Sequence, residues 1–402
     1  MELIARVKAL AGQYFEKVRA IRRHLHQNPE LSFQEYNTSA YLQEALRSLQ
    51  VPFTSGHVKT GIVAEIQGRN PSRKTILIRA DMDALPIEEK NNVPYRSVNP
   101  GVMHACGHDV HSSVVLGAVM ILQHLRDEFE GTVKVMFQPG EEVLPGGASL
   151  MIREGVLKDP PVQKALALHV FPSMACGKVG FRQGMYMAST DELYIRVTGK
   201  GGHAAMPSEY HNPLLAASAI LLEIDKRFSA EHALAGTAGE TIPTVVAFGK
   251  IEGKGATNVI PETVEIAGTL RTMEESWRMQ MHNELTMLVR AVAESRHCKA
   301  ELRIEKGYPV LFNNPDFTAS CEQAAREFLG KDMVEELPLR MTAEDFAFIS
   351  QAVPSCFFRL GTGNEAKGIS SGVHTPGFDI DENALETGMG LMAWLAVCEL
   401  RA

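Results

Sequence analysis

A series of short apolar segments in the first half of the chain constrains the fold more than any other feature. The segments span residues 61–66, 75–80, 132–137 and 165–168. They are apolar on both faces, and stretches with helical patterns accompany them, at 3–27, near 110–125 and at 146–153. Strands that are buried on both faces occur in mainly parallel sheets covered by helices. The first half therefore predicts an α/β fold.

From about residue 184 the pattern changes to alternation of apolar and polar residues, which is typical of a sheet with one solvated face. The predicted elements, in order, are a strand at 191–198, a helix at 213–227, strands at 241–251 and 262–271, a helix at 274–296 and a strand at 299–304. This order is that of a ferredoxin-like α+β domain. The α/β pattern then resumes, with helices predicted at 315–329 and 382–400 and a strand at 355–360.

We therefore predict a discontinuous α/β domain formed by residues 1–183 and 307–402, with a smaller α+β domain of residues 184–306 inserted into it. A length of 402 residues is compatible with two or three domains.

Composition excludes several classes of function. A net charge of −8 gives no electrostatic footprint for nucleic acid or an anionic membrane. No apolar run reaches the roughly 18 residues that span a bilayer, and the N-terminal segment is typical of an amphipathic helix rather than a secretory signal. The six cysteines are widely spaced and form no disulfide framework. We expect a cytoplasmic protein with no nucleic-acid or membrane partner.

Residues of the types that bind metal ions follow the predicted strands. They are Asp81 and Asp83 after the second strand, Glu141 and Glu142 after the third, His169 after the fourth, Cys106 and His108 between the second and third, and His374 in a Gly/Ser-rich loop before the last helix. Ligands bind at the carboxyl ends of strands in open α/β sheets. Because several carboxylates in one cleft repel each other unless a cation is present, this pattern predicts one or two divalent metal ions.

The predicted ligand types include a thiolate, imidazoles and carboxylates. Zinc accepts all three, whereas manganese, cobalt and nickel stay open alternatives. Each residue alone has a structural explanation, such as a strand-end turn for the two aspartates or a buried apolar role for Cys106. The coincidence of four segments at one sheet edge favours a metal site. We interpret His24 and His26 as structural, and His104, His111 and His211 as residues that support ligands or cap helices. The His-Glu-x-x-His and Walker motifs are absent.

Six motifs along nearly the whole chain resemble those of a known enzyme family. They are RRHLHQNPELSFQE (22–35), ILIRADMDALPIEE (76–89), MHACGHDVHSS (103–113), FQPGEEVLPGGASLMI (137–152), GKGGHAAMP (199–207) and AEDFAF (343–348). The sequence resembles the bacterial and plant amidohydrolases that include hippurate hydrolase, indole-3-acetyl-amino-acid hydrolases, N-acetyldiaminopimelate deacetylase and N-acyl-L-amino acid amidohydrolases. This group is a branch of the metallopeptidase family of aminoacylase and carboxypeptidase G.

The resemblance implies a catalytic domain with two divalent metal ions and an inserted lid or dimerisation domain. The implied metal ligands are Cys106, His108, Glu142, His169 and His374. Glu141 would be the general base, and Asp83 would orient a ligand histidine or stabilise the metal shell. Many members of the larger family have His-x-Asp where this chain has Asp81-Met82-Asp83. Whether Asp81 binds metal is therefore open.

The activity implied is hydrolysis of the amide bond of a small N-acyl amino acid, with an N-acetyl, N-benzoyl or similar group, to a carboxylic acid and a free amino acid. His203 of the inserted domain is the candidate donor to the developing oxyanion, and Asn258 and Arg271 are candidate contacts for the substrate carboxylate. In the wider family such a histidine can reach the neighbouring subunit, so we expect a homodimer or a higher homo-oligomer. Alternatives are a dipeptidase or carboxypeptidase on the same scaffold, and a non-catalytic binding protein, against which Glu141 argues.

Overall fold

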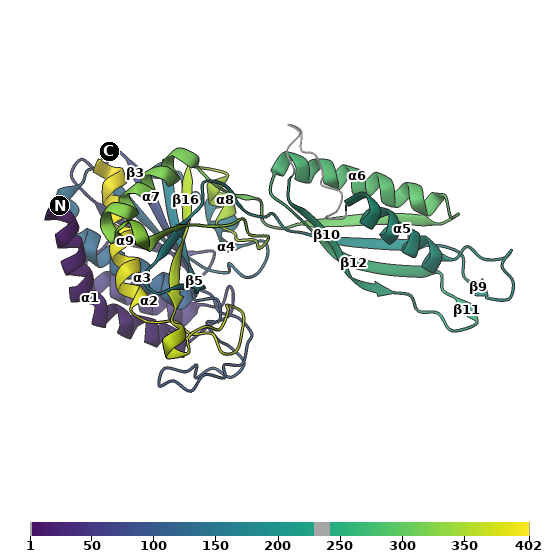
Figure 1. Cartoon of the computed structure of the whole chain (residues 1–402), viewed down its shortest axis with the longest axis horizontal. Coiled ribbons are helices and arrows are strands. Elements are labelled where there is room, and N and C mark those ends of the chain that lie inside the picture. Colours follow the sequence, from purple (N-terminus) through teal and green to yellow (C-terminus); the bar gives the residue numbers. More distant parts are fainter. Residues whose placement is uncertain (1, 229–241, 402) are drawn as a thin grey trace. The chain divides into compact units, whose positions relative to one another are not determined.

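The computed structural model describes residues 2–228 and 242–401, and the chain divides into two compact units (Figure 1). The larger unit comprises Met1–Gly184, Phe312–Pro338 and Asp345–Ala402, and the smaller unit comprises Met185–Leu311 and Leu339–Glu344. The chain passes between them along β7 (Gly184–Met187) and β14 (Leu311–Asn313). The sequence pattern does not predict the return of Leu339–Glu344 to the smaller unit.

The larger unit is built on an eight-stranded sheet of order β1-β2-β4-β3-β5-β16-β6-β15. The strands are β1 (Phe53–His57), β2 (Gly61–Gln67), β3 (Thr75–Asp81), β4 (Thr132–Gln138), β5 (Lys164–Ala175), β6 (Val179–Phe181), β15 (Val334–Glu336) and β16 (Ser355–Gly363). Strands β4, β3, β5 and β16 are parallel neighbours, whereas β2 and β6 join this centre antiparallel. Every residue of β3, β4 and β16 is buried, which agrees with their doubly apolar sequences.

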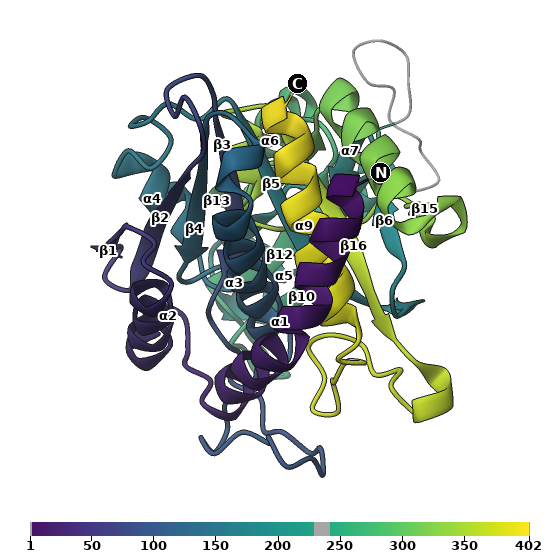
Figure 2. The ribbon, with the colours of Figure 1, turned by 90° about the vertical axis from the view of Figure 1, so that its left-hand side faces the viewer.

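Helices cover both faces of this sheet. They are α1 (Glu2–Gln27), α2 (Tyr36–Ser48), α3 (His108–His124), α4 (Gly147–Arg153), α7 (Pro315–Leu329), α8 (Ala347–Ser350) and α9 (Ala384–Arg401). Helices α1, α3 and α9 pack against one another on one face (Figure 2), and α4 and α8 contact each other on the opposite face (Figure 1). The prediction of a mainly parallel sheet covered by helices is confirmed.

The smaller unit contains a four-stranded antiparallel sheet of order β10-β12-β8-β13, backed by two helices. Its elements are β8 (Asp191–Thr198), α5 (Pro213–Phe228), β10 (Thr244–Glu252), β12 (Thr263–Thr272), α6 (Glu275–Glu294) and β13 (Lys299–Lys306). Alternate residues of β8 are buried, as its sequence predicts. A separate two-stranded ribbon pairs β9 (Gly202–His203) with β11 (Val259–Ile260).

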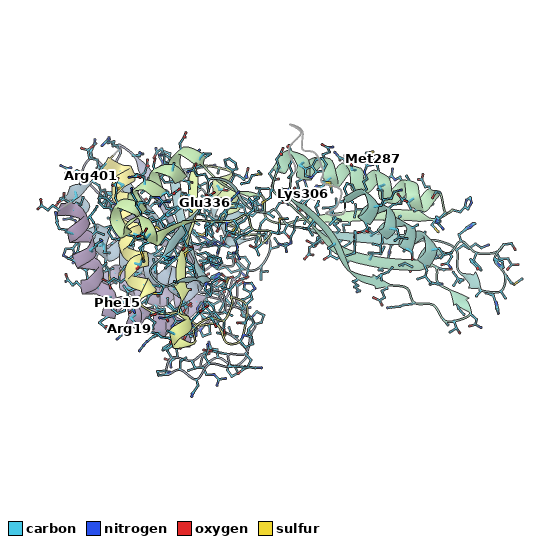
Figure 3. All side chains as sticks on the ribbon, in the orientation of Figure 1. Phe15, Arg19, Met287, Lys306, Glu336 and Arg401 are labelled. Carbon is cyan, nitrogen blue, oxygen red and sulfur yellow. The ribbon has the colours of Figure 1, made fainter. Side chains whose placement is uncertain are left out.

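Side chains on the outer faces of α5 and α6 include large apolar groups. Leu222 of α5 is 69% exposed, and Met287 of α6, labelled in Figure 3, is 64% exposed. Within the described part of the chain, no helix combines the length and the hydropathy that a membrane crossing requires.

The packing of α1, α3 and α9 depends on a glycine at their contact. A Cβ atom placed on Gly117 of α3 would lie 2.8 Å from the Met389 sulfur of α9 and 2.9 Å from a methyl carbon of Val18 on α1. We therefore expect Gly117→Val to lower the free energy of unfolding by about 1–3 kcal/mol through overpacking, measured by urea denaturation. Gly249→Val is the control, because no atom lies within 4 Å of the added Cβ at that position. Equal denaturation midpoints for the two variants would contradict this account.

Candidate metal centre

The carboxyl ends of the parallel strands place the predicted ligands of the larger unit at one edge of the sheet. Strand β3 ends at Asp81, β4 ends three residues before Glu141, β5 carries His169, and α3 begins at His108. Gly107, immediately before α3, has φ +85°, a left-handed conformation that disfavours side chains. This glycine lets the chain turn between Cys106 and His108.

The Cys106 thiol lies at the centre of a cluster of nitrogen and oxygen ligands. Its Sγ is 3.3 Å from His169 Nε2 and 3.2 Å from His374 Nε2. His374 Nε2 is in turn 3.3 Å from Glu142 Oε1. His169 Nδ1 donates to the carbonyl oxygen of Val170 at 2.8 Å, which leaves the lone pair on Nε2 directed at the cluster.

His108 completes the cluster from the first turn of α3. Its Nδ1 is 3.1 Å from Asp83 Oδ1, so its Nε2 faces inward, 3.8 Å from Glu142 Oε1. Within the described residues, both His108 Nε2 and Glu142 Oε1 are buried without a hydrogen-bond partner. A buried polar atom left in this state costs free energy, and a cation between the two atoms would satisfy both.

The donor atoms are close enough to share metal ions. Five sets of side chains have ligand atoms within 4.8 Å of one another in the described residues. Three of them join the predicted ligands: Cys106 with His108 and His169, Cys106 with Glu142 and His374, and His108 with Glu141 and Glu142. Because the sets overlap, the structure brings all five predicted ligands and Glu141 into one cluster. The mixture of sulfur, nitrogen and oxygen donors fits a divalent metal centre.

The pKa values of the side chains in the cluster also indicate that a cation would be stabilised there. Burial raises the pKa of the Cys106 thiol well above its usual value, and the charges of Glu142, Glu141 and Asp81 raise it further. Burial opposes protonation of His108, but the carboxylates of Asp81, Asp83 and Glu142 outweigh it and raise the His108 pKa to about 10. Both shifts have the same cause, an excess of buried negative charge, which a divalent cation would offset.

Asp81 lies beside this cluster, and its carboxylate is already engaged. Arg79 donates to Oδ2 and His111 Nδ1 to Oδ1, both at 2.6 Å. Although burial disfavours its charged form, the positive charges of His108 and Arg79 and the hydrogen bond from His111 hold the Asp81 pKa well below its usual value. His111 Nε2 accepts the Val170 N–H at 3.0 Å, so both nitrogens of His111 are used. These contacts give Asp81 and His111 a supporting role.

Glu141 lies next to the ligands and is 6% exposed. The Asp345 N–H approaches its Oε1 at 3.4 Å. Asp345 is itself fixed by Arg79 at 2.6 Å and by Gln138 at 2.7 Å. The sequence pattern indicates no role for Arg79 or Asp345. Their position inside two of the quoted motifs is the only signal that could have drawn attention to them.

A second buried network supports the segments that carry His108 and His374. Arg22 of α1 donates to Asp109, the neighbour of His108, at 2.8 Å, and to Asp379 in the loop after His374 at 2.9 Å. His26 also contacts Asp109 at 2.8 Å. The prediction that His26 is structural agrees with this position.

The candidate residues of the smaller unit do not all lie together. His203 is exposed on β9, paired with Val259, and the Ala204 N–H donates to the Asn258 carbonyl at 3.0 Å. Arg271 instead lies near the end of β12, where its guanidinium donates to the Met341 carbonyl at 3.0 Å. The β9–β11 ribbon adjoins the opposite end of β12, so Arg271 is distant from His203 and Asn258 (Figure 1).

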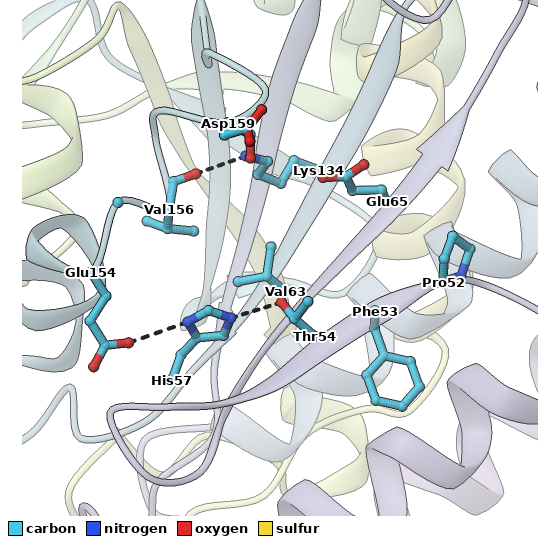
Figure 4. A pocket seen from close by; sticks show the side chains of 11 residues that line it. Pro52, Phe53, Thr54, His57, Val63, Glu65, Lys134, Glu154, Val156 and Asp159 are labelled. Carbon is cyan, nitrogen blue, oxygen red and sulfur yellow. Dashed lines mark hydrogen bonds and ion pairs between the residues drawn. The ribbon is translucent and has the colours of Figure 1, made fainter.

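A cavity elsewhere in the larger unit contains none of the predicted site residues. It has a volume of about 410 Å³ and lies against β1, β2 and β4 (Figure 4). Lys134 forms part of its wall, and its ammonium group donates to the carbonyls of Val156, Asp159 and Pro160 at 2.7–3.0 Å. These bonds use all three donors of the ammonium group.

Comparison with known proteins identifies the family. The model of peptidase family M20/M25/M40 matches residues 77–397, which include all the residues of the cluster. The chain belongs to this family. The resemblance to the amidohydrolase branch of the metallopeptidases is therefore confirmed.

Relatives within the M20 family have different described activities. An N-acetyl-L-cysteine deacetylase of Bacillus subtilis is 34% identical over 365 residues, covering 91% of this chain and 84% of that protein. Thermostable carboxypeptidase 2 of Saccharolobus solfataricus is 34% identical over 404 residues, covering 99% of each chain. The crystal structure of Bacillus subtilis YxeP, described as a dinuclear metal binding peptidase, has a TM-score of 0.84 and 31% identity, covering 97% of this chain and 99% of that one. The chain is thus an M20 hydrolase whose relatives include both amidohydrolases and carboxypeptidases.

The pKa values of the cluster predict how metal binding depends on pH. Metal ligands must lose their protons, and because the His108 pKa is raised to about 10 and the Cys106 pKa is raised well above its usual value, both groups carry protons at neutral pH. We therefore expect metal affinity to rise as the pH increases toward about 10. Isothermal titration calorimetry in buffers of different ionisation enthalpy measures the number of protons released when the metal binds. The Cys106→Ala variant should release fewer protons than the wild type. Affinity that does not change with pH would contradict the prediction.

Proposed function

We propose that this M20 protein hydrolyses the amide bond of N-acyl amino acids to a carboxylic acid and a free amino acid. The observation that carries the proposal is the position of Glu141, which shares a ligand-forming set with His108 and Glu142. A base beside a metal cluster is needed for hydrolysis and has no use in simple binding. The N-acetyl-L-cysteine deacetylase relative supports an N-acyl substrate.

In this proposal Cys106, His108, Glu142, His169 and His374 hold two divalent cations, with zinc, manganese, cobalt and nickel as the candidates. Such ions would supply Lewis acidity to the scissile carbonyl and to the attacking water. Glu141 accepts a proton from that water and later donates it to the leaving amine. Asp83 orients His108 through the 3.1 Å contact with its Nδ1.

His203 is proposed to stabilise the oxyanion that develops on the substrate carbonyl. Its Nδ1 accepts the Ala205 N–H at 3.1 Å, which places the proton of a neutral ring on Nε2 and leaves that group free to donate. Asn258, in the turn that leads into β11, and Arg271 are the proposed contacts of the substrate carboxylate. Arg271 would have to exchange its bond to Met341 for the substrate.

We further propose that the protein is a cytoplasmic homodimer or higher homo-oligomer. The exposed apolar side chains of Leu222 and Met287 on α5 and α6 support an interface formed by the smaller unit. In this arrangement His203 would serve the cluster of a neighbouring subunit.

A carboxypeptidase or dipeptidase is the second candidate function, because the Saccharolobus carboxypeptidase matches this chain end to end. A panel of N-acetyl, N-benzoyl and indole-acetyl amino acids beside free dipeptides, each with several metals, separates the two. The proposal expects the N-acyl amino acids to have the higher kcat/KM. Preference for dipeptides would favour the second candidate, and binding without turnover would favour a non-catalytic protein.

Replacing the base tests the mechanism. Glu141→Gln keeps the shape of the side chain but cannot take a proton, so we expect kcat to fall by about 100- to 10,000-fold. Elemental analysis should find the bound metal retained, whereas Glu142→Gln should lose metal. Turnover near the wild-type rate in Glu141→Gln would refute the assignment of the base.

His203→Ala tests the oxyanion donor. Loss of one such donor should lower kcat by about 100- to 1,000-fold with metal content unchanged. His211→Ala is a matched control, because His211 is also an exposed histidine of the smaller unit and its backbone N–H and carbonyl pair with those of Lys200. Equal kcat values in the two variants would show that His203 is a surface residue without a catalytic role.

A further inference from the structure

The backbone on both sides of Glu141 is fixed by buried carboxylates. The Gly140 N–H donates to Glu35 Oε1 at 2.8 Å, and the Glu142 N–H donates to Asp83 Oδ2 at 3.0 Å. Gly140 also accepts the Gly147 N–H at 3.0 Å. The turn that carries Glu141 is thus held at the residue before it and at the residue after it.

Both carboxylates are linked to the short segment between α1 and α2: Ser32 of this segment bonds to Asp83, and Glu35 belongs to the segment. Ser32 donates to Asp83 Oδ2 at 2.6 Å, and Glu35 is the last residue before α2. Glu35 is fully buried. It sits at the N-cap position of α2, yet its side chain makes no cap hydrogen bond to that helix. The carboxylate accepts a hydrogen bond from the turn that carries Glu141 instead of capping its own helix.

Glu35 is held in this orientation by further donors. Thr60 donates to its Oε2 at 2.8 Å, and the Phe33 N–H donates to its Oε1 at 2.8 Å. The carbonyl of Thr60 in turn accepts from Ser39 of α2 at 2.6 Å. Both oxygens of Glu35 are therefore occupied, and one of them joins the backbones of Phe33 and Gly140.

Phe33 contacts the same turn directly. Its backbone has φ +63°, a left-handed conformation that is uncommon for an aromatic residue. Gly140 has φ +61°, and a Cβ atom added there would lie 2.4 Å from the Phe33 ring. Two residues in left-handed conformations are therefore packed together and joined through Glu35. Strain of this kind persists only where the surrounding contacts enforce it.

We propose that Glu35 is a positioning residue that fixes the Glu141 turn from the segment between α1 and α2, so that the Glu141 carboxylate is aligned for proton transfer. The proposal rests on the proposed role of Glu141 as the base. The Glu35 carboxylate accepts hydrogen bonds from the Phe33 N–H, the Gly140 N–H and the Thr60 hydroxyl, none of which is a predicted ligand of the cluster. It acts on kcat, since alignment of a base affects the reaction more than it affects substrate binding.

Variants at Glu35 and Thr60 test the proposal. Glu35→Ala removes the acceptor of the Gly140 N–H, so kcat should fall by about 100-fold with KM little changed and bound metal retained. Glu35→Gln keeps an oxygen that can accept the Phe33 and Gly140 N–H groups, so it should recover most of the rate. Thr60→Val removes one donor to Glu35 and should give a smaller decrease. Glu399→Ala is the control, because Glu399 is a buried carboxylate at the amino-terminal edge of the sheet, paired with Lys74 and Lys164.

Amide hydrogen exchange gives a readout that needs no substrate. The peptide that contains Gly140 and Glu142 should exchange faster in Glu35→Ala than in the wild type, and at the wild-type rate in Glu35→Gln and Glu399→Ala. Unchanged exchange in Glu35→Ala would overturn the proposal, and so would unchanged kcat in an active protein. So would a loss of kcat that only parallels a loss of bound metal. If Glu35→Ala does not fold, wild-type kcat and wild-type exchange in Thr60→Val would overturn it.

The same experiment separates this proposal from the proposed function. If the wild type hydrolyses no compound of the substrate panel, the proposed function fails, and the exchange measurement alone still decides whether Glu35 fixes the turn. If the wild type is active and exchange is unaffected by Glu35→Ala, the positioning role fails while the proposed function stands.

Discussion

Several carboxylates are buried at one edge of the sheet of the larger unit, where they repel one another. The structure there depends on the groups that offset this repulsion. Asp81, Asp83 and Glu141 are each at most 6% exposed, and Glu142 lies beside them. Charges buried so closely are tolerated only when cations or hydrogen-bond donors oppose them. Arg79 and His111 satisfy Asp81, whereas His108 Nε2 and Glu142 Oε1, which lie 3.8 Å apart, make no hydrogen bond within the described residues. The requirement for a cation is therefore concentrated at these two atoms and the neighbouring thiol.

The parts of the fold that follow from local pattern could be predicted from the sequence. The alternation in Asp191–Thr198 defines β8, and the capped, amphipathic segment Pro315–Leu329 defines α7. The pattern does not predict α2, or the short strands β6 and β15, which form only because neighbouring strands pair with them. The return of Leu339–Glu344 to the smaller unit has no local signal either, since it depends on long-range contacts such as that between Met341 and Arg271.

In the candidate site, too, some features could be predicted from the sequence and others could not. Ligand types at strand ends could be predicted, because parallel strands bring their carboxyl ends to one edge. The supporting residues could not, since their roles depend on partners far away in the sequence. Asp345 reaches Arg79, and Glu35 reaches Gly140. The sequence also does not reveal that Arg271 lies in the four-stranded sheet whereas Asn258 lies in the turn before β11, because the chain turns between β11 and β12.

We propose that the side chains of Cys106, His108, Glu142, His169 and His374 form a two-metal centre. Anomalous X-ray diffraction from crystals of the purified protein, collected at the absorption edges of zinc, manganese, cobalt and nickel, can locate the bound ions. We expect two anomalous peaks within bonding distance of these five side chains, with Glu141 adjacent to them. Peaks confined to other parts of the chain, or a metal-free cluster in fully active protein, would contradict it.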